Sequence, residues 1–240
     1  MIIYLVCFFL IILFSDILEK NKTNDGNKIL KKVSIIIIII IMTVFAGYRD
    51  ENIGTDVLVY AKPVLNAVNN YGFSFAYQTA NVEYLFVVIA QIASFIDGNI
   101  NTFLLLIQLV MSILIVKCAL YEKETKNIPL YLMTYLCMFY GIGFNLMRQS
   151  IAMLIVLYGI RFIKQNKLLK YIITIIIATL FHTTAIFMIS LYPIWILLKT
   201  KDKMVYKFLI IAVLVSAMLF ILPILNGLIS LGIVPEKFVR

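Results

Sequence analysis

The sequence predicts an all-α, polytopic membrane protein with about eight transmembrane helices, in one integral membrane domain over residues 1–240. Three observations lead to this fold class. Hydrophobic residues make up 63% of the chain and charged residues only 14%, whereas about a quarter of a soluble domain is charged, so a water-soluble globule is excluded. The apolar residues form eight runs, and a membrane span needs about 20 mostly apolar residues. Most basic residues gather at the ends of these runs.

The first two runs illustrate how each element is assigned. Residues 1–18 lack the basic start and the small-residue cleavage pattern of a signal peptide, so we expect a retained first span. Residues 33–47 contain seven consecutive isoleucines, which favour a strand in water, but the charge-free interior of this run indicates a membrane helix. The other runs cover residues 84–96, 102–120, 128–144, 150–163, 168–198 and 204–222.

Four basic clusters set the predicted orientation. They lie within residues 20–32, 117–126, 161–170 and 199–207 and hold 16 of the 21 Lys and Arg residues. In a soluble protein this basic excess would suggest nucleic acid, but in a membrane protein it marks the cytoplasmic loops. If all four clusters are cytoplasmic, the N-terminus is extracytoplasmic and residues 48–82 form an extracytoplasmic loop.

Two segments do not fit this topology as simple spans. Between the outer loop and the second basic cluster the chain must cross the membrane an odd number of times, so the short run at residues 84–96 is predicted to be re-entrant or interfacial. Residues 171–198 begin and end on the same side and must form two legs of about 14 residues, or about 21 Å each. We expect the turn near Phe181 and His182, where it must pack in protein or line a wet cavity.

With this threading, polar residues from five distant segments meet on the outer face. They are Arg49, Asp50, Glu51, Asp56, Glu83, Asn145, Arg148, Gln149 and His182. Loops are polar in most proteins, so Asp50, Glu51 and Lys62 are weak candidates. Asp56 and Tyr60 have the i, i+4 spacing of one helix face. His182 is the only histidine, and in its apolar context it is either a packing residue or a catalytic base.

The arginines are informative because only four accompany 17 lysines. Arg49 and Arg148 therefore indicate a need for the planar guanidinium, which binds phosphate or carboxylate through two hydrogen bonds. The simpler alternative is an arginine at a helix end that reaches the lipid headgroups. In NLMRQSIA, at residues 145–152, helical spacing predicts that Asn145, Arg148 and Gln149 share one face and form a ledge that binds an anion.

Several kinds of site have no signature in the sequence. We find no glycine-rich phosphate loop, no G-x-S-x-G elbow and no Cys/His metal set, and the three cysteines show no pairing pattern. We therefore expect neither a metal nor a cofactor. An energy-coupled transporter would show paired charges inside spans or inverted repeats, and the sequence shows neither.

Four ordered motifs resemble the EpsG-like family of Wzy-type bacterial polysaccharide polymerases. They are GYRDENIGTDVLVY at residues 47–60, Glu83 before an apolar run, NLMRQSIA, and TLFHTTAIF at residues 179–187. The resemblance covers roughly residues 40–200. It implies a multi-pass glycosyltransferase of the bacterial cytoplasmic membrane that joins oligosaccharide repeat units, carried on undecaprenyl diphosphate, into capsular, exo- or O-antigen polysaccharide at the outer face. Family members are usually longer, so we expect a short or C-terminally truncated variant.

The resemblance also implies roles for individual residues. Its recurrent polar positions fall on Arg49, Asp56, Tyr60, Glu83, Arg148, Gln149 and His182. Asp56, Glu83 and His182 are the candidate catalytic residues, and each is available as the general base for the acceptor hydroxyl. The candidates for binding diphosphate or sugar are Arg49, Tyr60, Asn145, Arg148 and Gln149. Tyr71, Phe73, Phe75 and Tyr77 are candidates for stacking on sugars or for facing the membrane interface.

The expected partners are the undecaprenyl-diphosphate-linked oligosaccharide, the lipid bilayer and a polysaccharide chain-length regulator, with no nucleic acid. A lipid-diphosphate donor carries its own leaving group, so catalysis needs no nucleotide or metal if cations balance the charge that develops. Two other functions stay open. A lipid-linked glycan ligase or acyltransferase would use the same outer arginines, and a transporter or flippase would need cationic residues along a continuous cavity.

Overall fold

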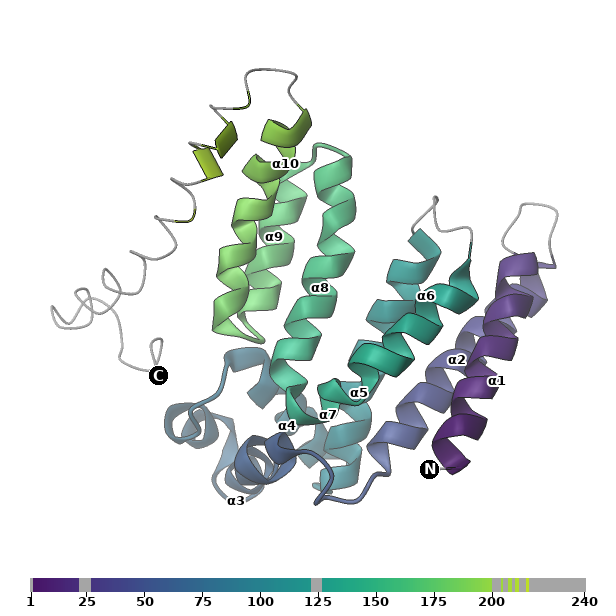
Figure 1. The fold of residues 1–240 in the computed structure, drawn as a ribbon. Coiled ribbons are helices and arrows are strands. Elements are labelled where there is room, and N and C mark those ends of the chain that lie inside the picture. Colours follow the sequence, from purple (N-terminus) through teal and green to yellow (C-terminus); the bar gives the residue numbers. More distant parts are fainter. Residues whose placement is uncertain are drawn as a thin grey trace, which may run out of the picture.

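The protein is a bundle of helices, described here from a computed structural model. The structure describes residues 2–21, 27–121 and 127–199, and in addition Met204, Lys207, Phe208, Ile210, Ile211 and Val215. Within these residues every regular element is a helix, as the sequence predicts. Most helices stand side by side, and α3 lies across one end of the bundle (Figure 1). Most of the run predicted at residues 204–222 lies outside the described residues.

The helices follow the predicted runs closely. They are α1 (Ile2–Lys20), α2 (Lys28–Gly47), the π-helix η1 (Val57–Ala61), α3 (Lys62–Thr79), α4 (Tyr84–Ile96), α5 (Ile100–Tyr121), α6 (Ile128–Tyr135), the π-helix η2 (Leu136–Tyr140), α7 (Ile142–Asn145), α8 (Met147–Lys164), α9 (Leu168–Thr179), the 3₁₀-helix η3 (Thr183–Ser190) and α10 (Leu191–Lys199). Asparagine side chains begin two of them: Asn27 caps α2 and Asn127 caps α6 by accepting backbone N–H groups.

Two of the described helices, α2 and α5, are long and apolar enough to cross a membrane. Shorter apolar helices cover Tyr84–Ile96, Ile128–Tyr140, Leu168–Thr179 and Thr183–Lys199. Large apolar side chains such as Ile36, Phe95 and Leu169 are exposed on the outside of the bundle. Exposed apolar surface of this kind suits contact with lipid. The number of about eight spans stays a prediction.

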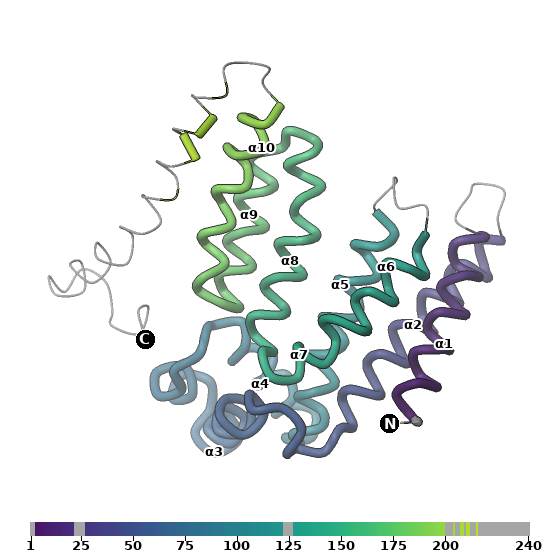
Figure 2. The backbone as a smooth tube through the Cα atoms, viewed as in Figure 1, coloured from purple at the N-terminus to yellow at the C-terminus, as the bar shows by residue number. Residues whose placement is uncertain are grey.

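The two ends of the bundle differ in charge. The ends of α1, α5 and α8 and the beginnings of α2, α6 and α9 lie together (top of Figure 2), and these helix ends carry lysines and arginines of the basic clusters. The opposite end holds α3, α7 and the turn between α9 and η3. This separation is the one that the positive-inside rule requires. Which side of the membrane each end faces stays a prediction.

The segment at residues 48–82, expected to be a loop, is largely helical. Val57, Ala61, Leu65 and Val68 recur at intervals of three or four residues and are buried, so η1 and α3 bury one face. The low average hydropathy of the segment hides this period in the sequence. That residues 48–82 lie outside the membrane stays a prediction. Gly72, with φ of +82°, bends the end of α3 in a conformation that favours glycine.

The predicted hairpin is confirmed. α9 is its first leg and η3 with α10 its second, and Leu180, Phe181 and His182 form the turn between them. The backbone N–H of Leu85, in the first turn of α4, donates to the carbonyl of Leu180 at 3.0 Å. This bond fastens the tip of the hairpin to the beginning of α4.

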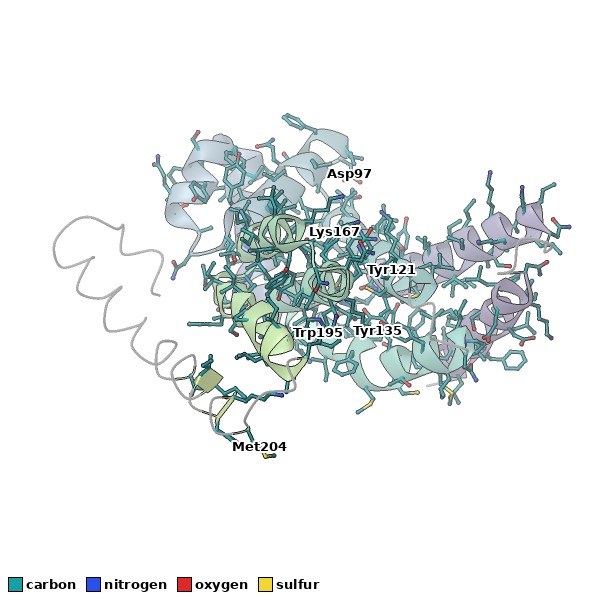
Figure 3. The ribbon with its side chains drawn as sticks, turned by 90° about the horizontal axis from the view of Figure 1, so that it is seen from above. Asp97, Tyr121, Tyr135, Lys167, Trp195 and Met204 are labelled. Carbon is teal, nitrogen blue, oxygen red and sulfur yellow. The ribbon has the colours of Figure 1, made fainter. Side chains whose placement is uncertain are left out.

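The helices pack in two groups. α2 packs against α1 and α5, while α8 packs against α9 and α5. Viewed along the helices, α5 and α6 stand between α1 and α2 on one side and α8, α9 and α10 on the other (Figure 3). Gly159 allows α8 and α9 to approach closely, since a Cβ at this position would lie 2.8 Å from Cγ2 of Thr174. The central helix α5 therefore joins the N-terminal helices to α8, against which the hairpin packs.

Candidate active site

Glu83 is the centre of a cluster of charged and polar groups from three distant segments. Its Oε2 accepts a hydrogen bond from Nη1 of Arg148 at 2.6 Å. Its Oε1 accepts from Nδ1 of His182 at 3.0 Å and from the backbone N–H of Thr183 at 3.2 Å. The Glu83 side chain is only 11% exposed. Both carboxylate oxygens are thus engaged within the protein.

Local structure brings the three segments together. Glu83 has extended backbone angles immediately before α4, where the positive end of the helix dipole favours a carboxylate. Arg148 lies in the first turn of α8, and His182 is the last residue of the hairpin turn. The bond between Leu85 and Leu180 holds that turn against α4. The cluster therefore depends on α4, α8 and the hairpin at once.

The surroundings of Glu83 keep it ionised. Burial alone raises the pKa of Glu83, but the hydrogen bond from His182 and the charge and hydrogen bond of Arg148 outweigh that effect and hold the pKa below its ordinary value of 4.5. An ionised carboxylate can only accept, so Nδ1 of His182 carries the proton in this bond. In neutral His182 the other nitrogen, Nε2, then has a free lone pair.

Arg148 is held in place by an aromatic ring as well as by Glu83. Its Cζ lies 4.0 Å from the centre of the Tyr60 ring, within the range of a cation–π contact. Its side chain is 13% exposed. Nε of Arg148 is buried and has no hydrogen-bond partner among the described residues. The guanidinium is therefore fixed in orientation mainly by Tyr60 and Glu83.

A groove of about 570 Å³ lies beside this cluster, between α6 and η2 on one side and α8 and η3 on the other. His182 lines it and is the residue shared between the groove and the Glu83 cluster. The other side chains in the groove that can form hydrogen bonds are those of Tyr135, Gln149, Ser150 and Thr184. Gln149 and Ser150 lie in the first turn of α8, and Thr184 lies in the first turn of η3. The remaining lining residues are Phe139, Ile142, Leu146, Ala152, Met153, Leu154, Val156, Leu157, Ile160, Ala185 and Met188.

Asp56 and Asn145 bind backbone groups instead of facing the groove. Oδ2 of Asp56 accepts the backbone N–H of Met147 at 2.8 Å, and Oδ1 of Asn145 accepts that of Thr55 at 3.1 Å. Burial raises the pKa of Asp56, an effect that the bond from Met147 and the charge of Arg148 oppose. These two bonds fasten the segment after α2 to the junction of α7 and α8.

Arg49 lies in the same junction and is buried. Its Nη1 donates to the carbonyl of Ala46 at 2.9 Å and its Nε to that of Ile53 at 3.1 Å. Nη2 lies 3.4 Å from Sδ of Met147, and the guanidinium sits 4.5 Å from the centre of the Phe144 ring. Burial lowers its pKa to about 10, so Arg49 stays charged at neutral pH. The structure does not bring Arg49 to the groove.

The predicted common face of Asn145, Arg148 and Gln149 is wrong. The helix breaks at Leu146, whose φ of −131° and ψ of 54° lie outside the helical range, so Asn145 belongs to α7 and the other two to α8. The three side chains separate: Asn145 binds Thr55, Arg148 binds Glu83, and Gln149 lines the groove. Capping of Met147 by Asp56 accompanies the break, because a new helix begins there.

The predicted aromatic residues divide into two pairs. Phe73 and Tyr77 pack edge-on against Tyr84, with ring centres 5.4 and 5.5 Å away, next to Glu83. Tyr71 and Phe75 contact each other and are exposed. The second pair is the more exposed of the two, because Phe73 and Tyr77 are partly buried.

Sequence reasoning missed the groups that carry no side-chain signature. The N–H groups of Thr183 and Met147 are backbone donors, and any residue other than proline would supply them. Ser150 and Thr184 also escaped notice because single hydroxyl residues near helix ends are common. In the described part of the chain, no three His, Cys, Asp or Glu side chains gather as a metal site requires.

Comparison with known protein families places most of the chain in one of them. The sequence model of the EpsG family matches residues 32–239. Comparisons with curated proteins and with solved structures give no significant match. The match covers the Glu83 cluster, the groove and the junction of α7 and α8.

Proposed function

Because this chain belongs to the EpsG family, whose members take part in polysaccharide biosynthesis, we propose that it is a membrane glycosyltransferase that polymerises lipid-linked oligosaccharide repeat units. The donor is a growing glycan on undecaprenyl diphosphate, and the acceptor is the next lipid-linked repeat unit. The reaction takes place at the end of the bundle that holds Glu83, Arg148 and His182, on the outer face of the cytoplasmic membrane. The contact between Glu83 and His182 at the polar end of an apolar groove carries this proposal.

The reaction needs one proton acceptor and no further reactant. The acceptor hydroxyl oxygen attacks the anomeric carbon of the donor sugar, and the bond from that carbon to the diphosphate oxygen breaks. The electron pair of this bond leaves with the lipid diphosphate, while the hydroxyl proton moves to the base.

His182 is the base that the geometry supports best. The carboxylate oxygens of Glu83 are held by Arg148, His182 and Thr183, and Asp56 is turned to the backbone of Met147. Of the three candidate bases, only His182 lines the groove, and its side chain is 24% exposed. Glu83 holds Nδ1–H and so presents the lone pair of Nε2, as a carboxylate does for the histidine of a hydrolase triad.

The same proton transfer helps the leaving group. Arg49 and Arg148 balance Asp56 and Glu83, so the four charges cancel and leave little excess positive charge for a diphosphate. When His182 takes the proton, an imidazolium forms at the same end of the groove, and its positive charge offsets part of the negative charge that develops on the departing diphosphate. In this mechanism Arg148 is a positioning residue that acts through Glu83, and the amide of Gln149 is a hydrogen-bond donor to the substrate.

A ligase or acyltransferase would use the same cluster and differ only in its acceptor. Transport has no comparable support among the described residues. A flippase needs polar groups along the whole path of the glycan, whereas the groove carries most of its polar side chains at one end.

The test is to compare His182→Gln and His182→Ala in cells that lack any other copy of the gene. We expect both variants to abolish polymer while single repeat units accumulate on the lipid carrier, because assembly upstream is unaffected. Membrane levels of the protein, measured by immunoblot, control for folding. Full-length polymer from His182→Gln would show that a base is not needed at this position and would overturn the mechanism.

A further inference from the structure

The groove beside His182 continues far beyond the reacting groups. From Gln149 to Ile160 it follows α8 over 12 residues, and the 11 steps between them span roughly 16 Å at 1.5 Å per step. The residues of α8 that line it include Gln149, Met153, Leu157 and Ile160, spaced three or four apart, so they form one stripe of the helix. A polar end with a long apolar extension matches a ligand that carries a polar group on a long apolar chain.

One flank of the groove is exposed. Met153 is 52% exposed, Leu157 39% and Met188 42%, whereas Ala152 and Val156 are almost fully buried. The groove thus has a closed floor and an open side. In a helix bundle with an apolar outer surface, a chain can enter such a groove sideways from the bilayer.

We infer that this groove binds the isoprenoid chain of the lipid-linked donor, with the diphosphate near His182 and Gln149 and the chain along α8 toward Ile160. The inference rests on the proposed function. Only the donor has its lipid one diphosphate away from the bond that breaks, whereas the reacting hydroxyl of the acceptor is separated from its lipid by sugars. A donor sugar placed at Nε2 of His182 therefore directs its lipid into the groove that His182 itself lines.

Photocrosslinking tests this placement. The photoreactive residue p-benzoylphenylalanine replaces Leu157 in the groove or, as a matched control, Ile40 on α2, which is apolar and 52% exposed. The purified full chain, reconstituted in vesicles with a radiolabelled lipid-linked repeat unit, is irradiated. We expect label on the protein from the Leu157 position to exceed that from Ile40 by about tenfold, the contrast between a specific site and bulk lipid.

Three outcomes would overturn the inference. They are equal labelling at the two positions, crosslinks at Leu157 to phospholipid alone, and crosslinks at Leu157 to residues 200–240 of the same chain, identified by mass spectrometry. Labelling requires binding and no turnover. Polymer formation without capture at Leu157 would refute lipid binding in the groove and leave the proposed function standing. Capture without polymer formation would support lipid binding in the groove and count against the proposed function.

A kinetic measurement gives a second test. Met153→Trp fills the groove away from the reacting groups, so we expect the KM for the donor to rise by about fivefold or more with little change in kcat. Ile36→Trp, an exposed position on α2, serves as the control and should leave both constants unchanged. An unchanged KM in Met153→Trp would contradict the inference.

Discussion

Oδ2 of Asp56 accepts the backbone N–H of Met147 at 2.8 Å and so joins two segments that lie 91 residues apart in the chain. The bond caps the beginning of α8, and Sδ of the same Met147 contacts Arg49. Arg148 and Gln149 follow directly, one bound to Glu83 and the other in the groove. Asp56 therefore determines where two residues of the site are placed, although it does not face the groove itself.

We expect Asp56→Asn to keep polymer formation, because an amide oxygen can still accept the N–H of Met147. Asp56→Ala removes the cap and should cost about 1 kcal/mol of stability, as helix caps typically do. Thermal unfolding in detergent and polymer yield per molecule check both outcomes. Loss of polymer in Asp56→Asn at normal protein levels would show that the carboxylate takes part in the chemistry.

Glu83→Gln should reduce polymer formation by about a hundredfold or more, the range typical of disrupted acid–base catalysis. The amide loses the ion pair with Arg148, and with only one oxygen it cannot accept from both Arg148 and Nδ1 of His182. Glu51→Gln is the matched control, because Glu51 pairs with Lys62 at 2.8 Å but both side chains are 41% exposed, and such surface pairs contribute little. Equal polymer yield from the two variants would argue against a central role for Glu83.

The pH dependence of stability provides a separate check on Glu83. Its folded-state pKa lies below 4.5, so its ionised form stabilises the protein fully above 4.5, and this contribution is lost as pH falls through the lowered value. The difference in melting temperature between wild type and Glu83→Gln should persist from neutral pH down to 4.5 and shrink below it. A difference that shrinks well above 4.5 would show that the carboxylate is not stabilised as an anion.

Arg148→Lys should lower polymer yield by about tenfold or more, because an ammonium cannot both stack on Tyr60 as a plane and hold Oε2 of Glu83. Tyr60→Phe keeps the ring and should retain polymer. Arg161→Lys is the control: Arg161 also stacks on a ring, that of Tyr158 at 3.4 Å, but lies near the basic end of α8. Parallel losses in Arg148→Lys and Arg161→Lys would indicate a general effect on folding.

Gly54→Ala should lower the amount of folded protein. Gly54 has φ of +101°, and a Cβ there would lie 2.3 Å from the carbonyl oxygen of Phe144, just before the break between α7 and α8. We expect a loss of at least about 1 kcal/mol from the backbone conformation alone. Gly141→Ala is the control, with φ of −68° and no atom within 4 Å of the added Cβ. Unchanged melting of Gly54→Ala would show that the segment can move away from α7.

The sequence predicted the helices whose ends coincide with a change from apolar to polar residues. The bounds of α4 and the hairpin turn at Phe181 and His182 are of this kind. The break at Leu146 could not be predicted, because leucine has no tendency to end a helix. It results from contacts with Asp56 and Gly54, which come from a part of the chain 90 residues earlier.

The sequence predicted which residues belong to the site better than it predicted which of them contact each other. Glu83, Arg148 and His182 were expected on one face, and the structure brings them into contact. Their pairing could not be predicted, because Arg148 had several carboxylates available on that face. The partners of Arg49 are the backbone carbonyl groups of Ala46 and Ile53. Every residue has such a carbonyl, so the sequence does not indicate these contacts.

The wide separation of Glu83 from its partners also sets an order of events during synthesis. Arg148 is made 65 residues after Glu83, and His182 follows 99 residues after it. At a synthesis rate of about 5–20 residues per second, His182 is added about 5–20 s after Glu83. In the folded protein Phe73 and Tyr77 also pack against Tyr84 at the beginning of α4, and these three residues are close together in the sequence. A chain that stops before the hairpin would contain Glu83 and Arg148 but would lack His182, the proton acceptor that we propose.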